Sequence, residues 1–329
     1  MEPIFHSEAK DSFDRVESLI LGTAPFFLAR LGGSDTDFVL EYLQLCLDIG
    51  PDQAIEKMLK KVATIKIFNG YYDRSDSSIS LIKYCNVMID SYMSCSDIFL
   101  AGRTWVTEYF PETVDSKWHL DDPIARAVHI RFMQMLADRQ ADLHFYPYGF
   151  VERVLRGWTL FRAFSKGLRG MKVLAITPLS QSIVQNSPNR TLFFKNYQYP
   201  EFELLTYTTP ITYDNLPERH YPHSNWLETV EHMQNDIAKM EFDIALLSCG
   251  SYAMPIGCFI KENMGKKAIY AGGILQLFFG IMGRRYNREY YLECLNPEAF
   301  IFPAERNQFD EQIKNIGDSG KTEALGAYF

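Results

Sequence analysis

The residues best able to perform chemistry follow a short apolar run near the start of the chain, in the sequence ARLGGSDTD. Arg30 precedes two glycines, Gly32 and Gly33, and the carboxylates of Asp35 and Asp37 follow at alternate positions. A guanidinium pairs with phosphate, glycine lets a ligand approach the backbone, and carboxylates hold divalent cations. One carboxylate could instead cap the next helix, but a cap uses a single side chain. We therefore predict catalytic roles for Arg30, Asp35 and Asp37, and metal binding for the two aspartates.

Three later segments, TPLSQSI, CGSYAMP and AGGILQ, have a similar layout. In each, an apolar run ends and small or polar residues open a helix, whose N–H groups and partial positive charge favour anions, phosphate above all. The serines of the first segment could equally be helix caps, and an arginine after the last helix could be a C-terminal cap. Together with the glycines that follow Arg30, the residues predicted to bind a phosphate-bearing ligand are Gly32, Gly33, Pro178, Ser180, Ser182, Gly250, Ser251, Tyr252, Gly272, Gly273, Gln276 and Arg284.

The elements that must position these residues alternate between short apolar runs and amphipathic segments. Strands are predicted at 26–31, 98–101, 143–148, 172–177, 202–208, 242–248 and 266–271, and helices at 11–21, 79–94, 121–138, 150–165 and 226–239. A further helix is predicted from the residue after Asp37 to the break at Gly50-Pro51, and another from that break to about residue 65. This alternation predicts an α/β fold with a Rossmann-like, mostly parallel sheet flanked by helices. Because parallel strands place their carboxyl ends on one edge of the sheet, we expect the turns that follow them to lie together and form a single ligand site.

The chain is expected to form two halves, residues 1–168 and 169–329, which meet at the turn before Lys172 with a ligand cleft between them. The first half carries the Arg30 turn, and the second carries the other glycine-rich turns.

Composition excludes several classes of protein. The net charge is −8 over 329 residues, which argues against a broad nucleic-acid-binding face. The six cysteines are scattered without a CxxC pair, as expected of reduced thiols in an intracellular protein. No apolar run approaches the ~20 residues that span a bilayer. We expect a soluble, cytoplasmic protein, and the sequence leaves its oligomeric state open.

Four segments together, ARLGGSDTD, KVLAITPLSQSI, FDIALLSCGSYAMPIGCFIK and GKKAIYAGGILQLFFGIMGRRY, resemble the GT-D class of glycosyltransferases, a bacterial and viral group related to polysaccharide biosynthesis. That class has Arg-x-Gly-Asp-Gly-Glu after its first strand. Arg30 and Gly32 match, Gly33 stands at the first acidic position and Asp35 at the second. The resemblance implies a nucleotide-diphosphate-sugar donor, a glycan acceptor and assistance from Mn²⁺ or Mg²⁺.

The sequence thus favours a glycosyltransferase that moves a sugar from a nucleotide sugar to a glycan or another hydroxyl acceptor. Asp35 is the candidate base or metal ligand, and Tyr252 and Gln276 are candidates for base or sugar contacts. A non-catalytic nucleotide- or sugar-binding protein on the same fold is the alternative, because Gly33 replaces an acidic residue. A Rossmann-type methyltransferase or dehydrogenase is less favoured, since no GxGxxG follows a first strand.

Overall fold

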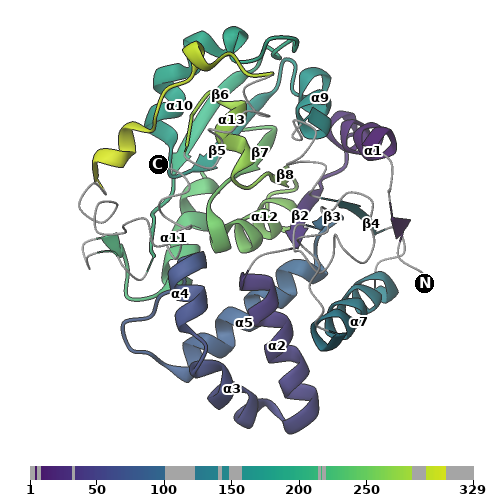
Figure 1. The fold of residues 1–329 in the computed structure, drawn as a ribbon, viewed down its shortest axis with the longest axis vertical. Helices are drawn as coiled ribbons and strands as arrows, with labels where there is room; N and C mark the ends of the chain where they lie inside the picture. The colour runs from purple at the N-terminus through teal and green to yellow at the C-terminus, as the bar shows by residue number, and fades with distance from the viewer. Residues whose placement is uncertain are drawn as a thin grey trace.

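The computed structural model describes residues 4–5, 9–31, 34–100, 123–139, 143–147, 158–213, 216, 220–283 and 294–308. Its centre is an eight-stranded sheet between two layers of helices (Figure 1). The strands are β1 (Ile4–Phe5), β2 (Phe27–Leu31), β3 (Asp97–Leu100), β4 (His144–Pro147), β5 (Lys172–Thr177), β6 (Glu203–Thr208), β7 (Ile244–Leu247) and β8 (Lys267–Tyr270). Their order is β1-β4-β3-β2-β8-β7-β5-β6, and every neighbouring pair is parallel. The predicted α/β class with a parallel, helix-flanked sheet is confirmed.

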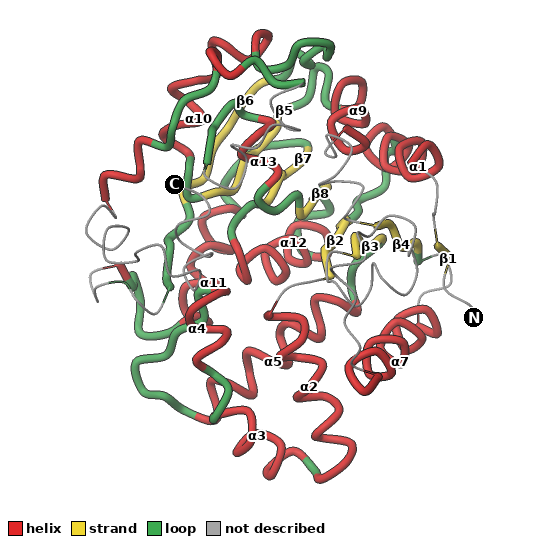
Figure 2. The backbone as a smooth tube through the Cα atoms, viewed as in Figure 1, coloured by secondary structure: helices red, strands yellow, loops and turns green. Residues whose placement is uncertain are grey.

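Each predicted half supplies four neighbouring strands, β1 to β4 from the first and β5 to β8 from the second. The two sets join where β2 pairs with β8, with Phe27 opposite Ala268 and Leu28 opposite Ile269. Figure 2 shows the strands as one yellow series through the molecule. The division into two domains remains a prediction.

Helices cover both faces of the sheet. One face is packed by α2 (Ser34–Ile49), α3 (Pro51–Leu59), α4 (Ala63–Asn69), α5 (Ser78–Met93), α7 (Pro123–Arg139), α11 (Trp226–Ile237) and α12 (Ala253–Glu262). The other is packed by α1 (Ala9–Leu21), α9 (Trp158–Gly167), α10 (Ser180–Asn186) and α13 (Ile274–Phe278). Short 3₁₀ helices η3 (Ser187–Leu192), η5 (Gly250–Tyr252), η7 (Pro297–Ala299) and η8 (Ala304–Gln308) complete the described part. None of the described helices is long and apolar enough to cross a membrane.

The apolar runs identified in the sequence are strands because they can bury side chains on both faces. In β2, Phe27, Ala29 and Leu31 join the core beneath α2, α5 and α12, whereas Leu28 joins the core beneath α1 and α9. All four are fully buried. A parallel sheet covered on both faces calls for such continuous apolar runs rather than strict alternation with polar residues.

Two features of the fold differ from the sequence-based prediction. The strand β1 was not predicted, because two residues are too few to show a pattern. The predicted helix 51–65 is interrupted between α3 and α4, where the N–H groups of Lys60 and Lys61 bond to the carbonyls of Lys57 and Met58, each three residues earlier. In the predicted helix 150–165, positions 150–157 lie outside the described residues, and α9 begins at Trp158.

Gly257 of α12 allows this helix to lie directly on β2. A Cβ atom at position 257 would be 2.1 Å from Cε2 of Phe27. We therefore predict that Gly257→Ala lowers the free energy of unfolding by roughly 1–3 kcal/mol through overpacking. That loss outweighs the helix propensity of about 1 kcal/mol that alanine gains over glycine. Urea denaturation measures the change. Adding Phe27→Leu should restore part of it, and a single variant as stable as the parent would contradict this account of the packing.

Candidate functional site

The carboxyl ends of β2, β8 and β7 meet around Tyr270. Arg30, the penultimate residue of β2, places its Cζ atom 5.6 Å from the centroid of the Tyr270 ring, within cation–π range. The Tyr270 hydroxyl donates a hydrogen bond of 3.1 Å to the carbonyl of Gly250, in the turn after β7. The arginine of the first turn and the glycine of a later turn therefore lie at the same edge of the sheet, as parallel strands require.

Asp35 is a buried carboxylate at the start of α2, with 4% of its surface exposed. Burial raises the pKa of Asp35 to about 6, and the N–H of Thr36 and the charge of Arg30 oppose this rise. The Thr36 N–H donates to Oδ1 of Asp35 at 3.0 Å. A carboxyl group with a pKa near neutrality can take up and release a proton under physiological conditions, as a general base must.

Asp37 does not join Asp35. The two residues are two positions apart on α2, so their side chains leave the helix on different sides, and Asp37 is exposed whereas Asp35 is buried. Across the described residues, no three His, Cys, Asp or Glu side chains are grouped so that they could hold a metal ion. The described side chains therefore do not fit a metal site built by the protein alone. Binding of Mn²⁺ or Mg²⁺ stays a prediction.

Asn69, which was not predicted from the sequence, connects the start of α2, at Ser34, to the turn after β7. The Ser34 hydroxyl donates to Oδ1 of Asn69 at 2.6 Å, and the Ser251 hydroxyl donates to the Asn69 carbonyl at 2.7 Å. Asn69 ends α4, and Gly70 follows in the left-handed conformation with φ of 77°. The Asn-Gly pair could have revealed the end of the helix, but not its contacts with residues so distant in sequence.

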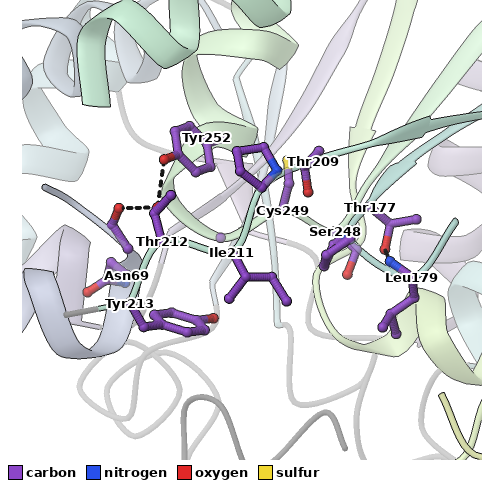
Figure 3. A pocket seen from close by; sticks show the side chains of 14 residues that line it. Asn69, Thr177, Leu179, Thr209, Ile211, Thr212, Tyr213, Ser248, Cys249 and Tyr252 are labelled. Atoms are coloured by element: carbon purple, nitrogen blue, oxygen red, sulfur yellow. Dashed lines mark hydrogen bonds between the residues drawn. The ribbon is translucent and has the colours of Figure 1, made fainter. Parts of the chain in front are cut away.

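A narrow pocket continues from Asn69 along the ends of β7, β5 and β6 (Figure 3). Its volume is about 40 Å³, and it is lined by Asn69, Gly70, Thr177, Pro178, Leu179, Thr209, Pro210, Ile211, Thr212, Tyr213, Ser248, Cys249, Gly250 and Tyr252. Pro178, Gly250 and Tyr252 were predicted to bind the nucleotide sugar, and that role stays a prediction. The segment after β6 was missed, because it carries no glycine to mark it as a ligand-binding turn.

Tyr252 is held on both its ring and its hydroxyl. The ring stacks on Trp226 at 5.6 Å between centroids, and the hydroxyl bonds to Oγ1 of Thr212 at 2.7 Å. Thr212 in turn donates to the carbonyl of Gly70 at 2.6 Å (Figure 3). These contacts tie the turn after β6 to the end of α4 and to η5, so the lining of the narrow pocket is fixed by hydrogen bonds.

The three predicted serines use their hydroxyls within the protein. Ser251 accepts a hydrogen bond from Nε1 of Trp226 at 2.9 Å in addition to its bond to Asn69, and Ser180 donates to the carbonyl of Thr177 at 3.0 Å. Ser182 bonds to the carboxylate of Glu305 through its hydroxyl, and also through its N–H at 3.0 Å. The first turn of α10 therefore already receives an anion from the chain itself, and a phosphate group would have to compete with Glu305.

The remaining predicted residues follow β8 or lie outside the described residues. Gly272, with φ of 62°, donates its N–H to the carbonyl of Leu247 at 3.0 Å and so joins the turn after β8 to the end of β7. Gly273 precedes α13, and Gln276 is buried within it. Gly32, Gly33 and Arg284 lie outside the described residues. Ligand binding by all of these residues stays a prediction.

No protein-family profile and no curated protein matches the chain. Two solved structures are similar to it, each at 12% identity over 92% of this chain and 98% of the other, with TM-scores of 0.35 and 0.32. The first is a selenomethionine-substituted structure of domain of unknown function 1792. The second is described as showing that this highly conserved domain has a distinct glycosyltransferase fold. Because TM-scores this low do not establish a shared fold, the functional conclusion below rests on the site itself.

The burial of Asp35 predicts a pH-dependent gain in stability for Asp35→Asn. Raising a carboxyl pKa from 3.8 to about 6 corresponds to at most about 3 kcal/mol of destabilisation when the group is ionised. Below about pH 4 the carboxyl is protonated in both the folded and the unfolded state, so the two proteins should differ little. The advantage of the variant should grow between pH 4 and about 6 and be complete above that range.

Thermal or urea unfolding at about pH 4 and about pH 8 measures this difference. Asp37→Asn is the matched control, because it makes the same substitution two residues away at an exposed position and should change stability little at either pH. Equal stability of Asp35→Asn and the parent protein above pH 7 would show that the carboxylate is better solvated than its burial indicates.

Proposed function

We propose that the protein is a glycosyltransferase that moves a sugar from a nucleotide-diphosphate sugar to a hydroxyl group of a glycan acceptor. The observation that carries the proposal is the buried Asp35 carboxyl, with its pKa raised to about 6, which interacts with the charge of Arg30 at the carboxyl end of a central strand. Glycosyl transfer needs both a proton acceptor and a positive charge for the departing diphosphate, and these two side chains supply them.

The proposed reaction assigns a separate task to each side chain. Ionised Asp35 accepts the proton of the acceptor hydroxyl as that oxygen bonds to the anomeric carbon of the donor sugar. The bond between the anomeric carbon and the diphosphate oxygen breaks, and its electron pair leaves with the nucleoside diphosphate. Arg30 lies where its guanidinium can pair with that departing charge. The ring of Tyr270 keeps the guanidinium at the sheet edge through the cation–π contact.

The donor is proposed to lie across the carboxyl edge of the sheet rather than inside the narrow pocket. A volume of about 40 Å³ holds little more than one water molecule. In this proposal the donor passes over the mouth of the narrow pocket, and the backbone at Gly250 and Gly272 allows its close approach. Both residues have positive φ, of 59° and 62°, a conformation that residues with a side chain rarely adopt.

Incubation with a panel of uridine- and guanosine-diphosphate sugars, with and without Mn²⁺, tests the activity through release of the nucleoside diphosphate in an acceptor mixture. Asp35→Asn should lower kcat by about 10²–10⁴-fold, the usual contribution of a general base. The rate of the parent protein should fall about tenfold for each pH unit below about 6, because protonated Asp35 cannot accept a proton. Asp52→Asn, the same substitution at an exposed position of α3 to which no role is assigned, serves as the control. Full activity of Asp35→Asn would refute the assigned role, and nucleotide binding without turnover would favour a non-catalytic binding protein.

Asn69→Ala tests whether the connection between the two turns matters for the reaction. Losing the side-chain acceptor for Ser34 should cost about 1 kcal/mol of stability, the usual worth of such a bond. If that bond also positions the start of α2, kcat/KM should fall by roughly tenfold. Ser77→Ala is the control, because it removes another side-chain acceptor, the Ser77 hydroxyl that accepts from the Ile79 N–H at the N-terminus of α5, and Ser77 is not among the residues assigned to the site. Equal effects of both variants on kcat/KM would show that Asn69 contributes only stability.

A further inference from the structure

A second, larger cavity, the histidine cavity, adjoins the narrow pocket and is lined by His223 and His232. Its volume is about 590 Å³, and the two share Pro178, Thr209, Pro210 and Ile211 as a common wall. The residues that further line the cavity include Gln181, Thr229, Asp236 and Glu305. This volume lies within the range of pockets that hold small molecules. His232 and Asp236 are both exposed, so the cavity opens to solvent.

Two stacked imidazole rings form one side of the histidine cavity. The rings of His223 and His232 are 4.0 Å apart between centroids and only 8° from parallel. Burial, together with the neighbouring His232, lowers the pKa of His223. The position of His223 is fixed, because its Nδ1 lies 3.0 Å from Oγ1 of Thr229, which bonds in turn to the Tyr72 hydroxyl at 2.6 Å. His223 therefore presents a neutral, immobile ring at neutral pH.

The charge of the cavity argues against a phosphate-bearing ligand. Asp236 and Glu305 both line it, and its described lining includes no lysine or arginine. Lys239 pairs with Asp236 at 3.2 Å but does not line the cavity. A nucleoside diphosphate would bring its phosphates close to two carboxylates with little positive charge to offset the repulsion. A neutral ligand would not incur this cost.

The polar groups of the cavity suit a ligand that both donates and accepts hydrogen bonds. Its carboxylates are acceptors, its glutamine amides and threonine hydroxyls do both, and its aromatic and imidazole rings offer flat faces. Sugar rings match this set, because they carry hydroxyls around their edge and C–H groups on their faces. In the shared wall, the buried Oγ1 of Thr209 has no hydrogen-bond partner in the described structure. Such a hydroxyl is costly unless a ligand supplies its partner.

We propose that the histidine cavity binds a neutral sugar residue of the acceptor glycan, away from the reacting hydroxyl. This inference rests on the proposed glycosyltransferase function. An exposed cavity lets the rest of a glycan extend into solvent, and the narrow pocket leads from the shared wall to Asn69, next to the start of α2. In the proposed arrangement the donor, with its diphosphate, lies nearer the middle of the sheet edge, close to Arg30 on β2.

Nuclear magnetic resonance of the histidine rings tests the proposal on the full chain. The probes are the methyl glycosides of glucose, galactose, mannose and N-acetylglucosamine, each added alone, and uridine diphosphate added separately. At least one glycoside should shift the ring signals of His223 and His232 and bind with a millimolar dissociation constant. Asp236→Asn should weaken that binding about tenfold, as expected for the loss of one charged hydrogen-bond acceptor. Glu231→Gln is the matched control, because it removes an exposed charge from the same helix outside the cavity.

Each other outcome would overturn the proposal. Shifts of the ring signals by uridine diphosphate but by none of the glycosides would make the cavity a nucleotide site. Glycoside binding unaffected by Asp236→Asn would place the sugar elsewhere, and absence of glycoside binding would remove the site. The proposed enzyme class is tested separately by nucleotide-sugar turnover and its dependence on Asp35, so the two ideas can fail independently.

Discussion

The parallel direction of the strands is the constraint on which the rest of the structure depends. Each strand must finish at the same edge, and the chain must cross a face of the sheet before it can begin the next strand. The turns after β2, β5, β7 and β8 are far apart in sequence, yet this rule gathers them along one rim. Tyr270 and Asn69 then join particular turns by direct contact. The parallel strands bring the turns of the candidate site to one edge, and these hydrogen bonds then hold particular turns together.

The same arrangement accounts for the unusual state of Asp35. A helix that starts at the end of a central strand has one side of its first turn covered by neighbouring elements, so a side chain on that side, such as Asp35, loses its water. The first-turn N–H of Thr36 and the charge of Arg30 recover only part of the lost hydration, and the pKa of Asp35 therefore rises. A protein selected for stability alone would gain by placing a neutral residue at this position. The buried carboxyl is therefore a candidate for a chemical role rather than a contribution to stability.

Much of the fold was predictable because strand length, helical periodicity and turn residues are local properties. The runs KVLAIT and KKAIYA form β5 and β8 almost as predicted, and Gly50-Pro51 separates α2 from α3. The site was less predictable, because its geometry depends on contacts between distant residues. Ser182 had the sequence context of a phosphate ligand, but its partner is Glu305, more than a hundred positions away. Asp35 and Asp37 looked like a pair in sequence, and helical geometry separates them.

The charged side chains differ between one region and another of the carboxyl edge of the sheet. Arg30 lies on the central strand β2, whereas Asp236 and Glu305 line the histidine cavity beside β5 and β6, near one end of the sheet. Between them, the narrow pocket is lined by hydroxyl, amide and apolar groups without a charged side chain. In the first region the guanidinium of Arg30, beside the Asp35 carboxyl, offers a diphosphate a partner, whereas the side chains with charge in the second region are carboxylates that repel it. A neutral glycan meets no such repulsion. Electrostatics can therefore assign the two substrates of the proposed glycosyl transfer to different regions of one sheet edge, even though no single residue type in the sequence marks either region.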